Sequence, residues 1–365
     1  MKHKRKTDSP RKRATTNKKA GLPPGTLVHV GEIRTPVPAV QVMSFDTDAL
    51  VEAVLPDAAA VTRWQAPHPR VWLNVHGLQD AELMRAIGQR FGLHPLVMED
   101  ILNTGQRPKI DDYGDYLYCV IRMFTWHENT RSVEADQISV IIGREFVLTF
   151  QERPTGLFEA LRQRLRTPGA QLRSRGIDHL AHGVIDTLVD RYFTLVDALG
   201  SAAEAMEDEA AESPAPAVLR RINNLKHELL TVRRAAWPLR EVLGTLVRTE
   251  GGIFSEATRP YLRDILDHTL HVVELLDDVR DLLGDVLNIY LSSVSNRLNQ
   301  EVRVLTVLTM LFLPATLIAG IFGMNFETLP WAHATHGFWL SIGLMMTTAV
   351  LLAAILWRRE RRQRT

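Results

Sequence analysis

The residues best suited to recognise a metal ion form a short motif between two uncharged apolar segments. The motif is Gly323-Met324-Asn325, followed by Phe326 and Glu327. Mg²⁺ prefers rigid octahedral oxygen coordination and keeps its water shell tightly. The Asn325 amide oxygen can accept hydrogen bonds from first-shell waters, and the preceding glycine lets the backbone turn and approach closely. The motif therefore fits outer-sphere recognition of a small hydrated dication, and Glu327 would raise the local cation concentration unless it is merely solvated.

A column of side chains leads up to this motif along one face of an expected helix. Steps of three and four residues keep its members on that face. The column consists of Asn299, Val302, Leu305, Thr309, Leu313, Thr316, Gly320 and Gly323. If it lines a pore, its amide and hydroxyl rings would contact a passing ion, and its apolar rings would close by dewetting. An ordinary helix-packing stripe is the alternative interpretation.

Histidine and cysteine offer less for metal binding. His268 and His271 lie three residues apart on an expected helix, and His333 and His336 follow the motif. Neither pair has a third ligand nearby in the sequence, so a zinc site is not favoured. The single cysteine, Cys119, allows neither a disulfide framework nor a thiolate cluster within one chain and is expected to be a buried thiol.

Two segments, 304–322 and 337–357, contain no charged residue and have the length of a membrane span. Buried core helices are the alternative. The intervening segment 323–336 has no Lys or Arg, whereas Arg297 and Arg303 precede the first span and an arginine cluster follows the second. Positive charge on both outer flanks predicts a multi-pass protein of the cell inner (plasma) membrane with both termini in the cytoplasm.

The part that precedes the spans alternates strand and helix patterns. Expected strands are 26–30, 39–45, 71–75, 116–124, 137–142 and 146–151, and expected helices are 80–91 and 95–102. From residue 177 only helical patterns remain. No secretory signal pattern is present, so this part is expected to stay in the cytoplasm. The basic residues at the start are expected to form a solvated tail, because no nucleic-acid-binding module follows them.

The fold class predicted is an α+β membrane protein, with an N-terminal cytoplasmic α/β domain, a long helical stalk and two transmembrane helices at the C-terminus. The expected segments are a disordered basic tail (1–20), the α/β domain (21–176), a helical hairpin (177–254), the stalk helix (255–301), a pore-lining first span (302–322), a periplasmic loop (323–336), the second span (337–357) and a basic cytoplasmic tail (358–365).

The apolar stripe of the stalk continues without a break into the first span, which predicts one helix of roughly 65 residues, about 100 Å long. Its own domain cannot cover such a helix, so packing against copies of itself is expected. Two spans cannot enclose a water path alone, and a symmetric ring would repeat each lining residue around a pore.

The chain resembles the CorA family of magnesium and cobalt channels, in which a Gly-Met-Asn triplet lies between two spans. The resemblance covers essentially residues 21–360. The matching motifs are Gly323-Met324-Asn325, 290–296, 304–306, Pro314, 319–320, 237–241, 96–101 and 106–109.

The resemblance implies a homopentamer that lets Mg²⁺ into the cytoplasm down the membrane potential, with Co²⁺ as an alternative substrate and Ni²⁺ as a further candidate. It makes Gly323, Met324 and Asn325 the selectivity filter. It also assigns regulatory Mg²⁺ binding between subunits to Asp100 and Asp264, with Glu99 and Asp186 as second-site ligands. Carboxylates from two chains repel unless a cation lies between them, so bound Mg²⁺ would hold the channel closed. Solvated acids on helix faces are the alternative for Asp100 and Asp264.

Two other functions stay open at this point. Relatives with the same triplet and two spans transport zinc, and the triplet does not decide between Mg²⁺, Co²⁺, Ni²⁺ and Zn²⁺. A membrane-tethered sensor or enzyme is the alternative of another class. The sequence contains no phosphate-binding glycine loop, nucleophile elbow or paired metal-ligand motif, which argues against an enzyme and favours passive transport.

Overall fold

The computed structural model describes residues 21–249, 252–324 and 336–363. The chain divides into two compact units. The first takes in Met1–Asp208 and Pro216–Val286, and the second takes in Glu209–Ala215 and Leu287–Thr365.

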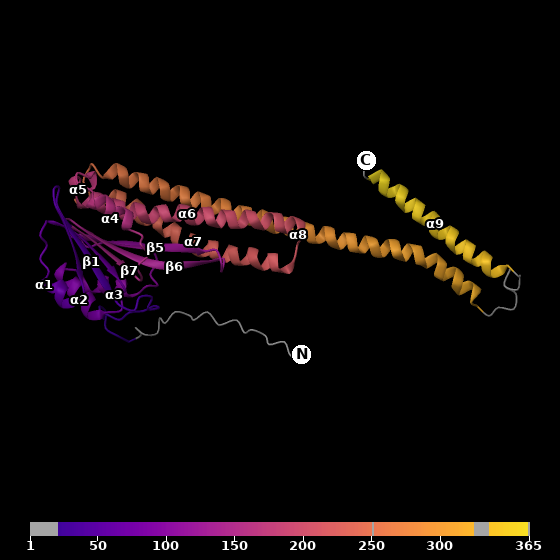
Figure 1. Cartoon of the computed structure of the whole chain (residues 1–365), viewed down its shortest axis with the longest axis horizontal. Helices are drawn as coiled ribbons and strands as arrows, with labels where there is room; N and C mark the ends of the chain where they lie inside the picture. The colour runs from indigo at the N-terminus through magenta and orange to yellow at the C-terminus, as the bar shows by residue number, and fades with distance from the viewer. Residues whose placement is uncertain (1–20, 250–251, 325–335, 364–365) are drawn as a thin grey trace. The chain divides into compact units, whose positions relative to one another are not determined.

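A seven-stranded sheet lies at the centre of the first unit, within the residues described (Figure 1). Its strands are β1 (Ala39–Phe45), β2 (Leu50–Leu55), β3 (Arg70–His76), β4 (Lys109–Asp112), β5 (Tyr116–His127), β6 (Ser132–Gly143) and β7 (Phe146–Gln151). The spatial order is β2-β1-β3-β7-β6-β5-β4. Only the central pair, β3 and β7, is parallel, and the other neighbours are antiparallel. The short strand β4 therefore lies at one edge.

One face of the sheet is covered by three short helices, α1 (Ala58–Arg63), α2 (Ala81–Arg90) and α3 (Pro95–Leu102) (Figure 1). Alternate strand residues such as Leu73 and Phe150 pack there against Ile87 and Ile101, all fully buried. Local sequence explains where these helices begin: the Asp80 carboxylate accepts hydrogen bonds from the first backbone N–H groups of α2, and Pro95 occupies the first turn of α3.

The opposite face is covered by α4 (Glu159–Arg166), α5 (Gln171–Ser174), α6 (Ile177–Glu212) and α7 (Pro216–Arg248). Trp72 of β3 packs edge-on against Phe158, and Phe124 of β5 packs edge-on against Tyr192 of α6. The Tyr192 hydroxyl also donates to the Arg122 carbonyl oxygen at 2.6 Å. The contact of Phe124 with Tyr192 thus joins the sheet to the hairpin formed by α6 and α7.

The longest element is α8 (Arg259–Phe322), an unbroken helix of 64 residues, and α9 (Gly337–Gln363) is the last helix described. The first half of α8 belongs to the first unit and buries an apolar stripe, for example Leu262, Ile265 and Leu276. The second half belongs to the second unit, and many of its large apolar side chains, such as Val302, Leu305 and Phe312, are exposed.

The predicted fold class is confirmed: an N-terminal α/β part precedes a long helix and two helices suited to span a membrane. The strand predicted at 26–30 is wrong. There, Val30 forms only an isolated bridge with Asn103 and exchanges backbone hydrogen bonds with the end of α3, outside the sheet. Gly25 and Gly31 flank the segment with positive φ, so it turns away at both ends.

Two strands, β2 and β4, were not predicted. Both lie at sheet edges, where one side of the strand faces solvent and an apolar alternation is not required. The long helix begins at Arg259 rather than at 255, because Ser255 and Thr258 are used in a hydrogen-bonded turn before it. The predicted segment boundaries otherwise stay predictions, and the basic tail at 1–20 lies outside the described residues.

Candidate metal-binding sites and membrane-spanning helices

Within the described part of the chain, two helices are long and apolar enough to cross a membrane: the distal part of α8, with mean hydropathy 2.3, and Gly337–Arg358 of α9, with mean hydropathy 2.1. Within the most apolar stretch of α8 none of the residues is buried. Apolar surface of this extent is not left in water by a soluble protein, so lipid or further protein must cover it.

The side chains of the predicted pore column do share one side of α8. At about 100° per residue, the six members from Val302 to Gly320 fall within a sector of about 80°. Val302, Leu305 and Leu313 are each about 60% exposed in the single chain. The distal column also contributes to an open hollow of about 660 Å³, lined by Thr309, Phe312, Leu313, Thr316, Leu317, Gly320, Ile321 and Met324.

Both column threonines bond back to their own helix. The Thr309 hydroxyl donates to the Leu305 carbonyl oxygen at 2.8 Å, and the Thr316 hydroxyl donates to the Phe312 carbonyl oxygen at 2.9 Å. These bonds use each hydroxyl proton and leave the oxygen lone pairs to accept from water. The threonines therefore present acceptors to a hydrated cation, whose first-shell waters are donors.

The helix ends at the predicted filter. Gly323 forms a turn in which its N–H donates to the Ala319 carbonyl oxygen at 2.9 Å, and the Met324 N–H donates to the Ile321 carbonyl oxygen at 3.2 Å. Asn325, Glu327 and His333 lie outside the described residues. Their predicted roles therefore stay predictions.

Asp100, the first predicted regulatory carboxylate, lies on α3 and is fully engaged within its own chain. One oxygen, Oδ1, accepts from Gln106 Nε2 at 2.7 Å, and the other, Oδ2, lies 2.7 Å from Lys109 Nζ. Lys109 also lies 2.6 Å from Asp111 Oδ2. Burial alone would lower the pKa of Lys109, but the hydrogen bonds that it donates to both carboxylates raise it, so the lysine keeps its charge.

Glu99 is also engaged: its Oε2 accepts from the Gly25 backbone N–H at 2.6 Å. Asp264 on α8 is two-thirds exposed, and its Oδ2 lies 3.9 Å from His268 Nε2, one turn further along. Among the described residues, no hydrogen bond or ion pair joins Asp100 to Asp264 in one chain. The structure thus leaves the Asp264 carboxylate open to solvent.

Asp186 lies in a group that could hold a metal ion, together with Asp190 and His268, whose ligand atoms all lie within 4.8 Å of one another. Burial raises the pKa of Asp186, an effect that His268 opposes and Asp264 reinforces. Burial and Asp186 raise the pKa of Asp190. Two neighbouring acids with raised pKa values are short of positive charge, which a divalent cation would supply.

Asp190 is not among the predicted metal ligands, and sequence neighbours alone pair His268 with His271, without a third ligand. In the structure, two α6 carboxylates face His268, while His271 lies 3.6 Å from Glu274 instead. The four-residue spacing of Asp186 and Asp190 on one helix face was the available signal.

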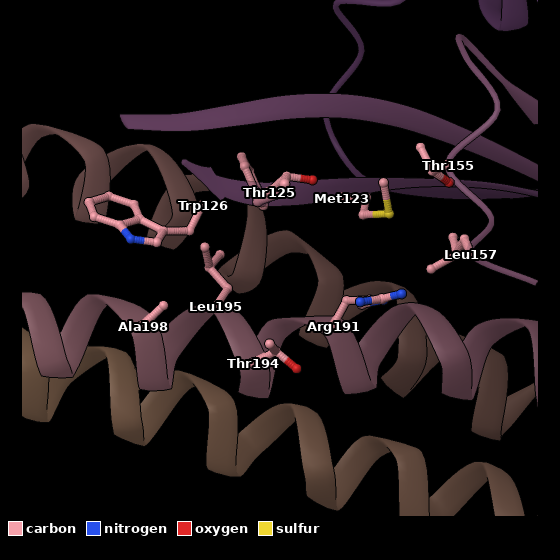
Figure 2. Close-up of a pocket in the computed structure, with 10 residues that line it drawn as sticks. Met123, Thr125, Trp126, Thr155, Leu157, Arg191, Thr194, Leu195 and Ala198 are labelled. Atoms are coloured by element: carbon pink, nitrogen blue, oxygen red, sulfur yellow. The ribbon is translucent and has the colours of Figure 1, made fainter. Parts of the chain in front are cut away.

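A separate cavity of about 340 Å³ lies between β5 and α6, as Figure 2 shows. Arg191 and Thr194 of α6 lie along one side, and Thr125 and Trp126 of β5 lie along the other. None of the predicted site residues lines it.

Comparisons with known proteins agree with this architecture. The family model of the CorA-like Mg2+ transporter protein matches residues 70–361. The chain is 36% identical to the cobalt/magnesium transport protein CorA of Thermotoga maritima over 342 residues, covering 94% of this chain and 97% of the relative. It is 30% identical to the putative metal ion transporter YfjQ of Bacillus subtilis, covering 78% and 87% of the two chains.

Among solved structures, the CorA magnesium transporter of Methanocaldococcus jannaschii superposes with a TM-score of 0.73 at 21% identity, covering 89% of this chain and 98% of that chain. That likeness shows a shared fold over 89% of this chain. The family is one of transporters, which removes the enzyme alternative. The chain belongs to the family of CorA-like Mg²⁺ transporter proteins.

Proposed function

We propose that five copies of the chain form a channel in the cell inner membrane that lets Mg²⁺ into the cytoplasm, driven by the membrane potential. Co²⁺ is an alternative substrate, and both termini lie in the cytoplasm. The observation that carries the proposal is the single helix α8. It bears the Asp264 carboxylate near its start, and near its end it has an uncovered apolar span that includes the column of polar and apolar side chains. Copies of such a helix packed around a shared axis would line a pore with the column and place Asp264 beside a neighbouring subunit.

In the proposed pore, Thr309 and Thr316 would each repeat as a ring of hydroxyl acceptors, and Val302, Leu305 and Leu313 as apolar rings. Asn299 would form a polar ring at the cytoplasmic end. The threonine bonds to the helix backbone support this role, because they leave acceptor lone pairs unused. Apolar rings between polar ones provide constrictions that dewet when the helices approach.

Selection is proposed at the ring formed by Gly323, Met324 and Asn325. Five amide oxygens would accept hydrogen bonds from the waters of a hydrated ion, so that the ion need not lose its shell. Glu327 would attract cations to the mouth. Gly323 supports close approach at this point, because a residue without a side chain leaves its backbone accessible.

Gating is proposed to depend on cytoplasmic Mg²⁺ held between neighbouring subunits by Asp100 of one and Asp264 of the next. Glu99 and Asp186 would assist at a second site, and Asp190 and His268 lie beside Asp186. The exposed Asp264 carboxylate supports an intersubunit role, because its own chain leaves it accessible. Mg²⁺ would bridge carboxylates that otherwise repel, and its loss would free the subunits to separate.

Mg²⁺ uptake into liposomes containing the purified protein tests the pore and filter together. Wild type should admit Mg²⁺ under an inside-negative potential, and Asn325→Ala should abolish uptake without dissociating the oligomer, as judged by cross-linking. Thr348→Ala, on α9, removes a hydroxyl bonded to its own helix and should leave uptake unchanged. Normal uptake by Asn325→Ala would refute the filter assignment, and Zn²⁺ uptake driven by a proton gradient without Mg²⁺ flux would make the protein a zinc transporter instead.

A further inference from the structure

Lys109 lies between two carboxylates at the point where α3 meets the edge of the sheet. Its Nζ is 2.7 Å from Asp100 Oδ2 and 2.6 Å from Asp111 Oδ2. The side chains of the three residues are between 28% and 40% exposed, so water and small cations can reach them. One ammonium group thus serves two acids at an accessible site.

The fold holds this lysine in place. Lys109 and Asp111 are two apart on β4, so their side chains leave the same face of the strand. Asp111 is opposite Tyr118 in the β4–β5 pairing, and the Tyr118 ring lies 5.2 Å from Lys109 Nζ in a cation–π contact. Strand pairing and the ring therefore keep the ammonium within reach of Asp100.

A tethered ammonium and a free dication compete for the same oxygen. Gln106 donates to Asp100 Oδ1 and Lys109 donates to Oδ2, so the oxygen that carries an ion pair is the one for which a cation would compete. A metal ion that takes Asp100 must displace Lys109 or accept a positive charge within hydrogen-bonding distance of its ligand. Both outcomes weaken binding.

We propose that Lys109 is a built-in counter-ion that occupies the Asp100 carboxylate when Mg²⁺ is absent and so sets the Mg²⁺ concentration at which that site fills. The inference rests on the proposed function, because it takes Asp100 as a regulatory ligand. The apparent dissociation constant of Mg²⁺ equals the intrinsic constant divided by the fraction of Asp100 that is free of Lys109.

Asp111 is the exchange partner in this arrangement. When Asp100 turns to Mg²⁺, Lys109 keeps its bond to Asp111, so its charge stays paired and the displacement costs one ion pair rather than two. Removing Asp111 would leave Lys109 with Asp100 as its only acid partner and would make displacement harder. Lys109 and Asp111 therefore have opposite effects on the same binding constant.

The test is the Mg²⁺ concentration that half-maximally raises the melting temperature of the purified full-length oligomer. A charge-assisted hydrogen bond lost at such a site corresponds to about tenfold in a binding constant. Lys109→Met should lower the half-saturating Mg²⁺ concentration about tenfold, and Asp111→Asn should raise it several-fold. Lys226→Met on α7 removes a lysine elsewhere in the same unit and should leave it unchanged.

The double variant Lys109→Met/Asp111→Asn shows whether Asp111 acts by pairing with Lys109 or by attracting Mg²⁺ directly through its negative charge. If Asp111 acts through Lys109, Asp111→Asn has no effect on Mg²⁺ binding in the Lys109→Met background. An equal loss of affinity in both backgrounds would overturn the exchange role, and an unchanged or raised midpoint in Lys109→Met would overturn the counter-ion role. A wild type that Mg²⁺ does not stabilise, or an Asp100→Asn variant with the wild-type midpoint, would instead refute the regulatory site itself.

Discussion

Asp178 ties the start of the long helix to the hairpin, and its loss should measurably destabilise the first unit. Its Oδ2 accepts from the Ser255 N–H at 3.0 Å, the Ser255 hydroxyl at 2.7 Å and the Thr258 hydroxyl at 2.8 Å. Asp178 is 7% exposed and Thr258 is 2% exposed. Burial alone would raise the pKa of Asp178, but these hydrogen bonds lower it below 3.8, so the carboxylate is charged at neutral pH.

Asp178→Ala removes a charged acceptor and leaves the buried Thr258 hydroxyl without it. A hydrogen bond to a charged group contributes a net value of about 1.5–3 kcal/mol to stability, and these values do not add where the bonds share one oxygen. We therefore expect Asp178→Ala to lower the free energy of unfolding by about 2–4 kcal/mol. For a unit of this size, 1 kcal/mol corresponds to about 2 °C, so the melting temperature should fall by about 4–8 °C.

Thermal unfolding of the purified oligomer, followed by circular dichroism at pH 7, measures this fall. Asp197→Asn is the control, because Asp197 is an exposed acid on the same helix. The folded pKa lies below the unfolded value, so the Asp178 contribution is complete at neutral pH and declines only below about pH 4. A fall of less than 1 °C for Asp178→Ala, or an equal fall for Asp197→Asn, would refute the view that Asp178 anchors α8.

Three further predictions follow from single side chains. Burial, with His182 nearby, lowers the pKa of His179 to about 4, so folding disfavours its protonation. The folded protein therefore loses stability as the pH falls from about 6.5 towards 4. Between pH 7 and pH 5, the melting temperature of His179→Leu should fall less than that of the wild type. Arg153 lies 2.7 Å from Asp136, which is 1% exposed, and Arg153→Met should cost about 2 kcal/mol in denaturant unfolding because one partner of a buried charge is lost. Asp264→Lys should raise the Mg²⁺ concentration inside liposomes that inhibits uptake, and an unchanged inhibitory concentration would contradict its gating role.

The elements that carry strong hydrophobic patterns could be predicted from sequence, whereas polar elements at the sheet edge could not. β1, β3 and β7 are buried along most of their length, and 14 of their 20 residues are apolar or β-branched. β4 reads Lys-Ile-Asp-Asp and carries no strand signal; its pairing with β5 makes it a strand. Segment 26–30 shows the opposite error of prediction. Its residues have strand-like types, but the segment has no neighbouring strand with which to pair.

The candidate site divides in the same way. The uncharged spans and the polar column are local patterns, and helix geometry alone places the column on one face. The group of Asp186, Asp190 and His268 depends on two helices that are far apart in sequence, so composition could not show it. The ion pair of Asp100 with Lys109 required the packing of α3 beside β4, and neither residue type nor spacing indicated that the acid is occupied.

Potential-driven Mg²⁺ entry into liposomes, with and without external cobalt(III) hexammine, tests the channel account most directly. That complex has the size of a hydrated divalent ion and cannot exchange its ligands, so it probes whether the filter recognises an intact shell. Mg²⁺ entry should increase as the interior is made more negative, and cobalt(III) hexammine should block it. Entry that ignores the potential, or that cobalt(III) hexammine leaves unaffected, would contradict passive conduction of the hydrated ion.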